Sequence, residues 1–288
     1  MSTEAEGRSK AEKFRADHHL GDQPLGDLAA VIEQTTGFDV AVLDVGPDEH
    51  GLAMRDPARD AVFIGVARTL NPMRQRSTLA HELGHVLFAD WVDTREVAWG
   101  GKSPTESRAN AFARHLLVPL AGLHEFLEGR PGPTLATLSA VVQRFLVSPA
   151  VAAIQLCEGR YIDVATKDEW KRHDTPQLAA RFGWSDQYGG LQAESNRRRA
   201  PQRLLARAIN GYAESVLSAQ AIATLRGIPL SEVEKDLQEA GVVPEQREVG
   251  WADAAELPNA DVDLAELDAA LSRPDEEGEG DAQDREVR

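Results

Sequence analysis

The sequence contains little of several residue types, and each shortage excludes a class of protein. It has one cysteine, Cys157, so no disulfide framework can form within the chain. Aromatic residues make up 6% of the sequence, which predicts a mainly aliphatic core. No apolar run approaches the roughly 18 residues that a membrane span needs. The first 30 residues also lack the apolar segment of a secretory signal. We therefore expect a soluble, cytoplasmic chain.

Negative charge is abundant but is concentrated at one end of the chain. The formal net charge is −16, and residues 251–288 hold 13 Asp and Glu against 3 Arg, a net charge of −10. The first 250 residues therefore carry only −6. A segment with many like charges and few large apolar residues cannot bury enough surface to offset the entropy lost on ordering. We predict that residues 251–288 form a disordered, mainly solubilising acidic tail.

The first part of the chain combines helices with a few strands. Apolar spacing predicts helices over residues 4–19 and 25–38, a strand over 38–45 and a hairpin made by 51–56 and 60–66. Asn71 followed by Pro72 is typical of a helix start, and we expect this helix to continue to about Phe88. The pattern predicts an α+β fold in which a small sheet packs on the helix over residues 72–88.

The rest of the chain is predicted to be mainly helical. A loop over residues 89–102 leads to a long helix that ends or kinks near Pro119. We divide the chain into a domain over residues 1–157, an irregular linker over 158–200, a helical module over 201–250 and the acidic tail.

Residues 133–157 have the outline of a helix-turn-helix. A DNA-recognition helix needs side chains that read bases or bind phosphate, and between Pro149 and Cys157 only Gln155 is of that kind. We therefore expect this segment to be a buttress of the first domain and direct DNA binding to be absent.

The helix over residues 72–88 contains the sequence His81-Glu82-Leu83-Gly84-His85. At about 100° per residue, the two histidines lie on one face, one turn apart, so that their imidazoles can bind a single metal ion. Neutral imidazole is a good ligand for zinc. Glu82 lies beside them and is placed to take a proton from metal-bound water. Apolar flanks predict a buried helix, where these polar groups without a partner would be costly.

Catalytic zinc usually has three protein ligands, and Glu106 is the best candidate for the third. It lies 21 residues beyond His85, in the first turn of the next long helix. The competing interpretation is a capping box, in which Ser103 and Glu106 satisfy each other's backbone amides. Spacing alone leaves both interpretations open.

Two stretches, RQRSTLAHELGHVLF (residues 74–88) and ESRANAFARHLLVP (residues 106–119), together resemble the ImmA/IrrE family of zinc metallo-endopeptidases. The resemblance implies a zincin-like fold and one Zn²⁺ ion held by His81, His85 and Glu106, with Glu82 as the general base. It also implies a cytosolic endopeptidase whose substrate is a helix-turn-helix repressor, so that cleavage relieves repression.

Two other functions remain as alternatives: a transcriptional regulator that uses a protease-like fold as a sensor, and an antitoxin-like interaction module. A peptide substrate would be favoured if residues 61–66 formed an edge strand beside the metal helix, because an extended peptide can add to such an edge. An internal strand is the competing interpretation. No residue that stabilises an oxyanion is identified, and we expect His115 to face away from Glu106.

Overall fold

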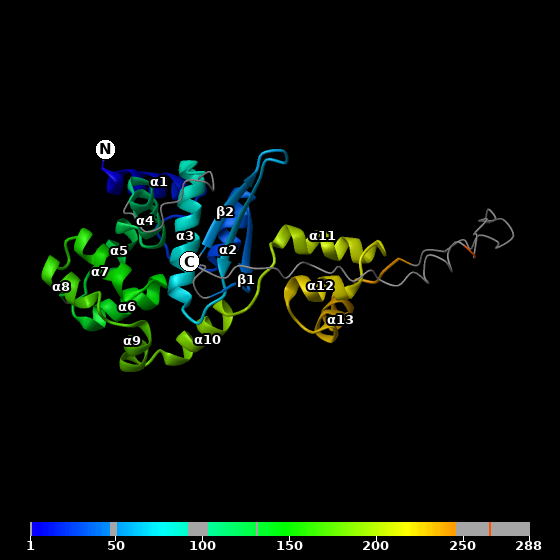
Figure 1. Cartoon of the computed structure of the whole chain (residues 1–288). Helices are drawn as coiled ribbons and strands as arrows, with labels where there is room; N and C mark the ends of the chain where they lie inside the picture. Colours follow the sequence, from blue (N-terminus) through cyan, green and yellow to red (C-terminus); the bar gives the residue numbers. More distant parts are fainter. Residues whose placement is uncertain (1, 47–50, 92–102, 131, 246–264, 266–288) are drawn as a thin grey trace, which may run out of the picture. The chain divides into compact units, whose positions relative to one another are not determined.

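The computed structural model describes residues 2–46, 51–91, 103–130, 132–245 and Ala265 (Figure 1). The chain divides into compact units after Glu245, and the unit from Met1 to Glu245 contains the sheet and helices α1–α13. Apart from Ala265, the acidic tail predicted over residues 251–288 lies outside the described residues.

The sheet has three strands, β1 (Asp39–Leu43), β2 (Gly51–Asp56) and β3 (Ala61–Ala67), in the order β1-β3-β2. Strand β3 pairs with β1 in parallel and with β2 in antiparallel orientation. Of the two interpretations left open for residues 61–66, the internal strand is correct, because β3 is the central strand. Its continuous apolar sequence fits a strand with neighbours on both sides and buried faces. The two edge positions beside β3 belong to β1, whose outer side forms an isolated bridge with Arg199, and to β2.

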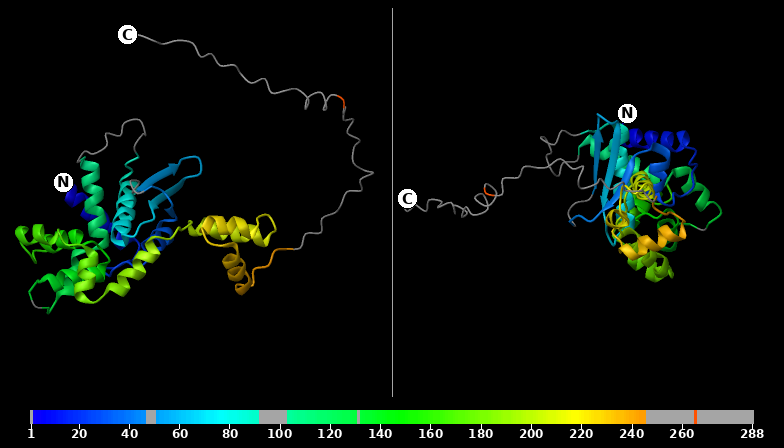
Figure 2. Two further views of the ribbon diagram at one scale, coloured as in Figure 1. Left: turned by 60° about the horizontal axis from the view of Figure 1, so that its bottom comes forward. Right: turned by 90° about the vertical axis from the view of Figure 1, so that its right-hand side faces the viewer.

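Helix α3 (Pro72–Phe88) lies between the sheet and helix α4 (Pro104–Leu117) (Figures 1 and 2). It begins as the sequence predicts, since the Asn71 side chain accepts a hydrogen bond from the Arg74 backbone N–H at 3.2 Å and Pro72 occupies the first turn. Gly84 allows α4 to approach closely: a methyl group at this position would lie 3.3 Å from the Ala109 Cα. The close approach brings side chains of α3 and α4 within reach of one another.

Two N-terminal helices complete the packing around α3 and α4. Helix α1 (Thr3–Asp17) packs across α4, and α2 (Leu28–Thr36) contacts both β1 and α3. Gly37 ends α2 in the left-handed conformation with φ 71°, as a glycine at this position predicts. The main hydrophobic core therefore also includes Ala11 and Phe14 of α1.

Three helices follow the break near Pro119 that the sequence predicts: α5 (Leu120–Leu127), α6 (Leu135–Phe145) and α7 (Pro149–Glu158). Gln155 of α7 is fully buried and donates a hydrogen bond to the Val118 carbonyl at 2.7 Å. Helix α7 thus uses Gln155, its one base-reading side chain, for internal packing. Among the described residues, no single helix meets the length and apolarity of a membrane span, and α6 with α7 does so only as a pair bent by 108°.

The prediction of an irregular linker over residues 158–200 is incorrect. This region forms three helices: α8 (Val164–Trp170), α9 (Thr175–Phe182) and α10 (Ser185–Ser195). Three aromatic residues, Trp170, Trp184 and Tyr188, join the main core. The Trp184 indole donates to the Ser139 hydroxyl at 3.0 Å, which fixes α10 against α6. These helices are short and polar, so their sequences lack the long apolar periodicity that predicts a helix. A few large side chains anchor them instead.

Helices α11 (Gln202–Ala213), α12 (Ala219–Arg226) and α13 (Leu230–Glu239) form a small helical module with a separate apolar cluster. Helices α12 and α13 are joined through Gly227, whose φ is 66°. Helix α13 carries four acidic residues and one lysine, an unfavourable charge for contact with nucleic-acid phosphates.

Candidate metal centre

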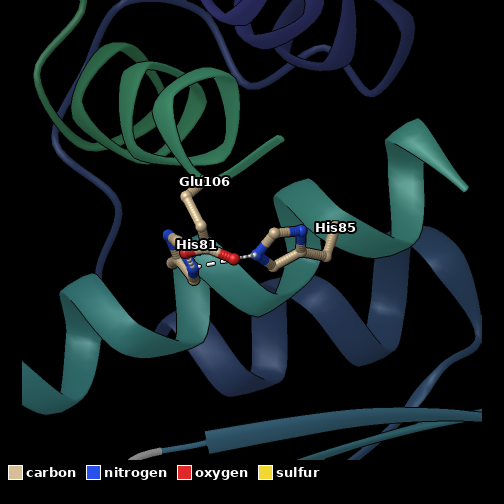
Figure 3. A group of neighbouring side chains, drawn as sticks. All are labelled: His81, His85 and Glu106. Atoms are coloured by element: carbon tan, nitrogen blue, oxygen red, sulfur yellow. Dashed lines mark hydrogen bonds and ion pairs between the residues drawn. The ribbon is translucent and has the colours of Figure 1, made fainter. Parts of the chain in front are cut away.

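His81 and His85 project from α3 toward α4, and Glu106 reaches them from the first turn of α4 (Figure 3). The two histidine Nε2 atoms are 2.9 Å apart. The Glu106 carboxylate lies 3.2 Å from each of them, with Oε2 toward His81 and Oε1 toward His85. Ligand atoms of all three residues lie within 4.8 Å of one another. The structure therefore brings together the three residues that the sequence analysis selected.

The position of Glu106 also bears on the capping-box alternative. Ser103 is the N-cap of α4, and its hydroxyl accepts a hydrogen bond from the Glu106 backbone N–H at 3.1 Å. The Glu106 carboxylate, however, is directed toward the two imidazoles. Glu106 thus contributes its backbone to the helix cap and its side chain to the cluster.

The chemistry of the cluster fits a metal ion. Burial, together with the neighbouring His85, lowers the pKa of His81 and favours the neutral imidazole, which is the form that binds metal. Two imidazoles and one carboxylate are typical protein ligands of a catalytic zinc ion, with a further position left open. Magnesium and calcium prefer sites made of oxygen atoms alone, so the donor set favours a transition-metal ion such as zinc over either of them.

Glu82 lies on the side of α3 that faces the start of β2. A methyl group on Gly51 would lie only 2.9 Å from Glu82 Oε1 and 2.6 Å from Thr78 Cγ2, so a glycine leaves room for the carboxylate. Burial raises the pKa of Glu82 to about 7. A carboxylate with this pKa can both accept and release a proton near neutral pH, and a cation held by the cluster would lower the value again.

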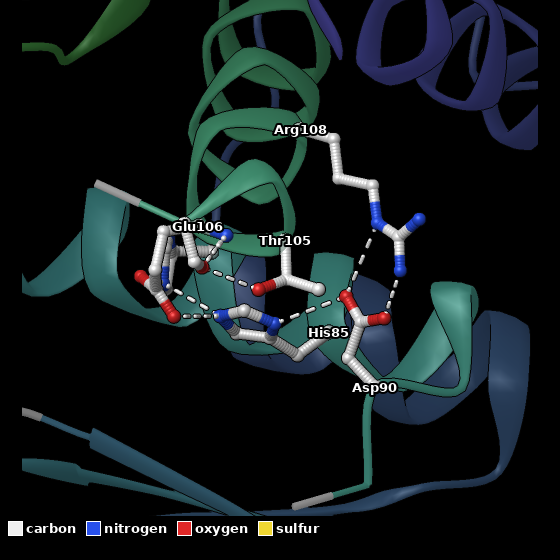
Figure 4. Close-up of polar contacts among 7 residues, drawn as sticks. His85, Asp90, Thr105, Glu106 and Arg108 are labelled. Atoms are coloured by element: carbon white, nitrogen blue, oxygen red, sulfur yellow. Dashed lines mark hydrogen bonds and ion pairs between the residues drawn. The ribbon is translucent and has the colours of Figure 1, made fainter. Parts of the chain in front are cut away.

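Asp90 is a site residue that the sequence analysis missed (Figure 4). Its side chain is 6% exposed, and its Oδ2 lies 3.3 Å from His85 Nδ1. Arg108 of α4 contacts both oxygens of this carboxylate. Metal-binding histidines commonly have their second ring nitrogen held by a carboxylate, which fixes the ring and raises its basicity. The signal in the sequence is an aspartate five residues after His85. In the structure, the left-handed conformation of Ala89 turns the chain back at the end of α3.

Replacing Asp90 with asparagine should weaken zinc binding about 10- to 100-fold, because the neutral amide orients His85 without supplying charge. The measurement is competition for zinc against a chelator of known affinity. Asp60→Asn is the matched control, since Asp60 is 84% exposed and its carboxylate pairs with Arg55 outside the cluster. Equal zinc affinity of the Asp90 variant and the control would show that Asp90 does not support the site.

His115 lies away from the cluster, as expected. It is 2% exposed, and its Nε2 lies 2.9 Å from Glu4 Oε1 on α1. Its Nδ1 is 3.3 Å from the Gln155 amide nitrogen of α7. The histidine therefore connects three helices of the core. The pKa of Glu4 falls to about 2, chiefly through the hydrogen bond with His115.

Comparison with known proteins agrees with this geometry. Residues 36–157 match the model of the IrrE N-terminal-like domain, peptidase family M78. The radiation response metalloprotease IrrE of Deinococcus radiodurans is 30% identical to the chain over 141 residues, which make up 47% of this chain. Residues 36–157 therefore match the ImmA/IrrE family of metallopeptidase domains.

The matched part of this ImmA/IrrE domain runs from the end of α2 to α7, so it includes the sheet, α3, α4 and the α6–α7 pair. The aligned stretch spans about two fifths (41%) of the length of the relative from Deinococcus radiodurans. The match therefore covers the elements that build the candidate metal centre.

Proposed function

We propose that the chain is a zinc-dependent endopeptidase that acts in the cytoplasm. The observation that carries this proposal is the cluster of His81, His85 and Glu106 next to a buried carboxylate of raised pKa, Glu82. The single cysteine is consistent with a reducing compartment.

Each residue of the centre has a distinct role in the proposed reaction. His81, His85 and Glu106 would hold one zinc ion, which when bound supplies Lewis-acid chemistry that activates water and polarises the peptide carbonyl. Glu82 takes a proton from the attacking water and delivers it to the departing amine. Asp90, held by Arg108, keeps the His85 ring oriented.

The exposed edge of the sheet supports a peptide as the substrate. Strand β2 is paired with β3 on one side, and within the described part of the chain no strand pairs with its other side. Leu52 and Met54 are 39% and 56% exposed on this strand. Gly51, at its start, lies against Glu82. An extended peptide added to this edge by strand pairing would run beside the proposed general base.

We further propose that the substrate is a helix-turn-helix transcriptional repressor. The resemblance to the ImmA/IrrE family supports this substrate class. The buried Gln155 makes α7 poorly suited to reading DNA, and the acidic α13 does the same for the α11–α13 module. Control of transcription would therefore act through a cleaved protein.

The test is to incubate the zinc-loaded full-length protein with an extract of its host and to map newly formed N-termini. We expect a small set of cuts, one of them in a helix-turn-helix repressor, that a chelator abolishes and that a Glu82→Gln protein does not produce. The absence of any cut specific to the unmodified protein would reject endopeptidase activity. Specific cuts that spare every such repressor would reject only the substrate class.

A further inference from the structure

A cavity of about 480 Å³ lies beside the face of α3 that is turned away from the metal centre. Gln75, Arg76 and Leu79 line it from α3, and at about 100° per residue His81 lies some 200° around the helix from Leu79. Val42 of β1 and Val66 of β3 contribute apolar walls. A largely apolar cavity of this size with a few polar groups is typical of small-molecule sites.

Two arginines at this cavity have no counter-ion among the described residues. Arg197 and Arg198 are exposed and lie in the connection between α10 and α11, where they form no ion pair or side-chain hydrogen bond with the described residues. Two other lining arginines are neutralised: Arg199 pairs with Glu33 and Arg226 pairs with Asp236, each at 2.6 Å. The cavity lining therefore carries unpaired positive charge.

Contacts with the domain hold the connection that carries these arginines. Val42 and Arg199 exchange two backbone hydrogen bonds, of 2.9 and 3.1 Å, which join the connection to the edge of β1. The Gln75 amide donates to the Ser195 carbonyl at 2.8 Å. The Arg198 stem packs against Gly227, where an added methyl group would lie 2.9 Å from Arg198 Cδ. Arg197 and Arg198 thus project from a backbone segment that is held in place by these contacts.

Inside the cavity, Arg76 supplies a further cation whose hydrogen bonds hold the wall together. Its guanidinium donates to the carbonyls of Gly26, Leu25 and Leu146, at 2.5, 2.7 and 3.2 Å. Burial lowers the pKa of Arg76 to about 10, which leaves the side chain charged at neutral pH. The carboxylates of Asp27 and Glu194, which also line the cavity, more than offset this single charge. Together with Arg197 and Arg198, these groups leave the lining with a net formal charge of +1.

We propose that this cavity binds a small organic anion with an apolar body, and that Arg197 and Arg198 bind its acidic group. The apolar body, of one or two rings or a short acyl chain, would lie against the side chains from β1, β3 and α3. Such a ligand would contact α3, the sheet and the turn between α12 and α13 together. The site is separate from the cluster of His81, His85 and Glu106, so it is an addition to the proposed peptidase function.

The test uses two fluorescent probes with the zinc-loaded full-length protein. 1-Anilinonaphthalene-8-sulfonate is an aromatic anion, and N-phenyl-1-naphthylamine is the same molecule without the sulfonate. We expect one saturable site for the anion. An Arg197→Gln/Arg198→Gln double variant should bind the anion at least tenfold more weakly and bind the neutral probe within about twofold of the unmodified protein.

Arg207→Gln is the matched control, because Arg207 is exposed on α11 and does not line the cavity. Zinc content and circular dichroism of each variant report that the fold is intact. Leu191→Glu, which places a negative charge on the cavity wall, should also weaken binding of the anion. Unchanged affinity for the anion in the double variant, or an equal loss in the Arg207 control, would overturn the proposal.

Discussion

Replacing Glu82 with glutamine is expected to abolish peptide cleavage while zinc remains bound. The amide is close in size to the carboxylate but cannot accept a proton from water. Loss of a general base lowers the rate about 10²- to 10⁴-fold. Because Glu82 lies toward β2 and outside the cluster of His81, His85 and Glu106, the metal ligands are unchanged. The measurements are kcat/KM on a mapped cleavage site and zinc content of the purified protein.

The matched control is Glu128→Gln, which changes an exposed carboxylate at the end of α5 and should leave both quantities unchanged. Cleavage by the Glu82 variant within tenfold of the unmodified enzyme would reject this residue as the base. Loss of zinc from the same variant would instead show that Glu82 is a ligand.

Replacing Glu106 with alanine is expected to remove zinc and, with it, all cleavage. The variant keeps the backbone N–H that binds the Ser103 hydroxyl, so the cap of α4 remains. It deletes the carboxylate that lies 3.2 Å from both imidazoles. Because a direct ligand is lost, zinc affinity should fall by more than the 10- to 100-fold typical of a change outside the ligand shell. Chelator competition measures this loss.

Ser103→Ala gives the reciprocal comparison. This variant removes the helix cap, at a cost of about 1 kcal/mol in the free energy of unfolding, and should keep zinc. Denaturant unfolding and zinc titration of both variants separate the two roles. If the Glu106 variant binds zinc normally and loses only about 1 kcal/mol of stability, the side chain serves the cap and the proposed metal site is incorrect.

Some residues of the proposed site can be recognised from local sequence signals, and others only from contacts between helices. The spacing of His81 and His85 follows from helix periodicity, and Asn71 with Pro72 marks the start of their helix. The role of Glu106 could not be decided from the sequence, because its spacing fits a capping box as well as a metal ligand. The packing of α3 on α4 distinguishes the two interpretations, since it directs the carboxylate toward the imidazoles.

Several features emerged only in three dimensions. The predicted hairpin of β2 and β3 is present, but the sequence left open that β3 is central and that β1 and β2 are the edges. The helices between residues 164 and 195 rest on a few aromatic anchors, such as Trp184 on Ser139. Asp90 joins the site because Arg108, 18 residues later, returns to hold its carboxylate.

The sequence by itself determined the metal-binding helix, the candidate ligands, the strands and most helix boundaries, because these depend on side-chain periodicity and on caps within a few residues. Only the tertiary structure decided which strand has a free edge, where Asp90 and Gln155 lie, and that a cavity opens behind α3. Those features depend on contacts between residues far apart in the chain. Such contacts form only when the whole apolar core is buried together, so no local pattern encodes them.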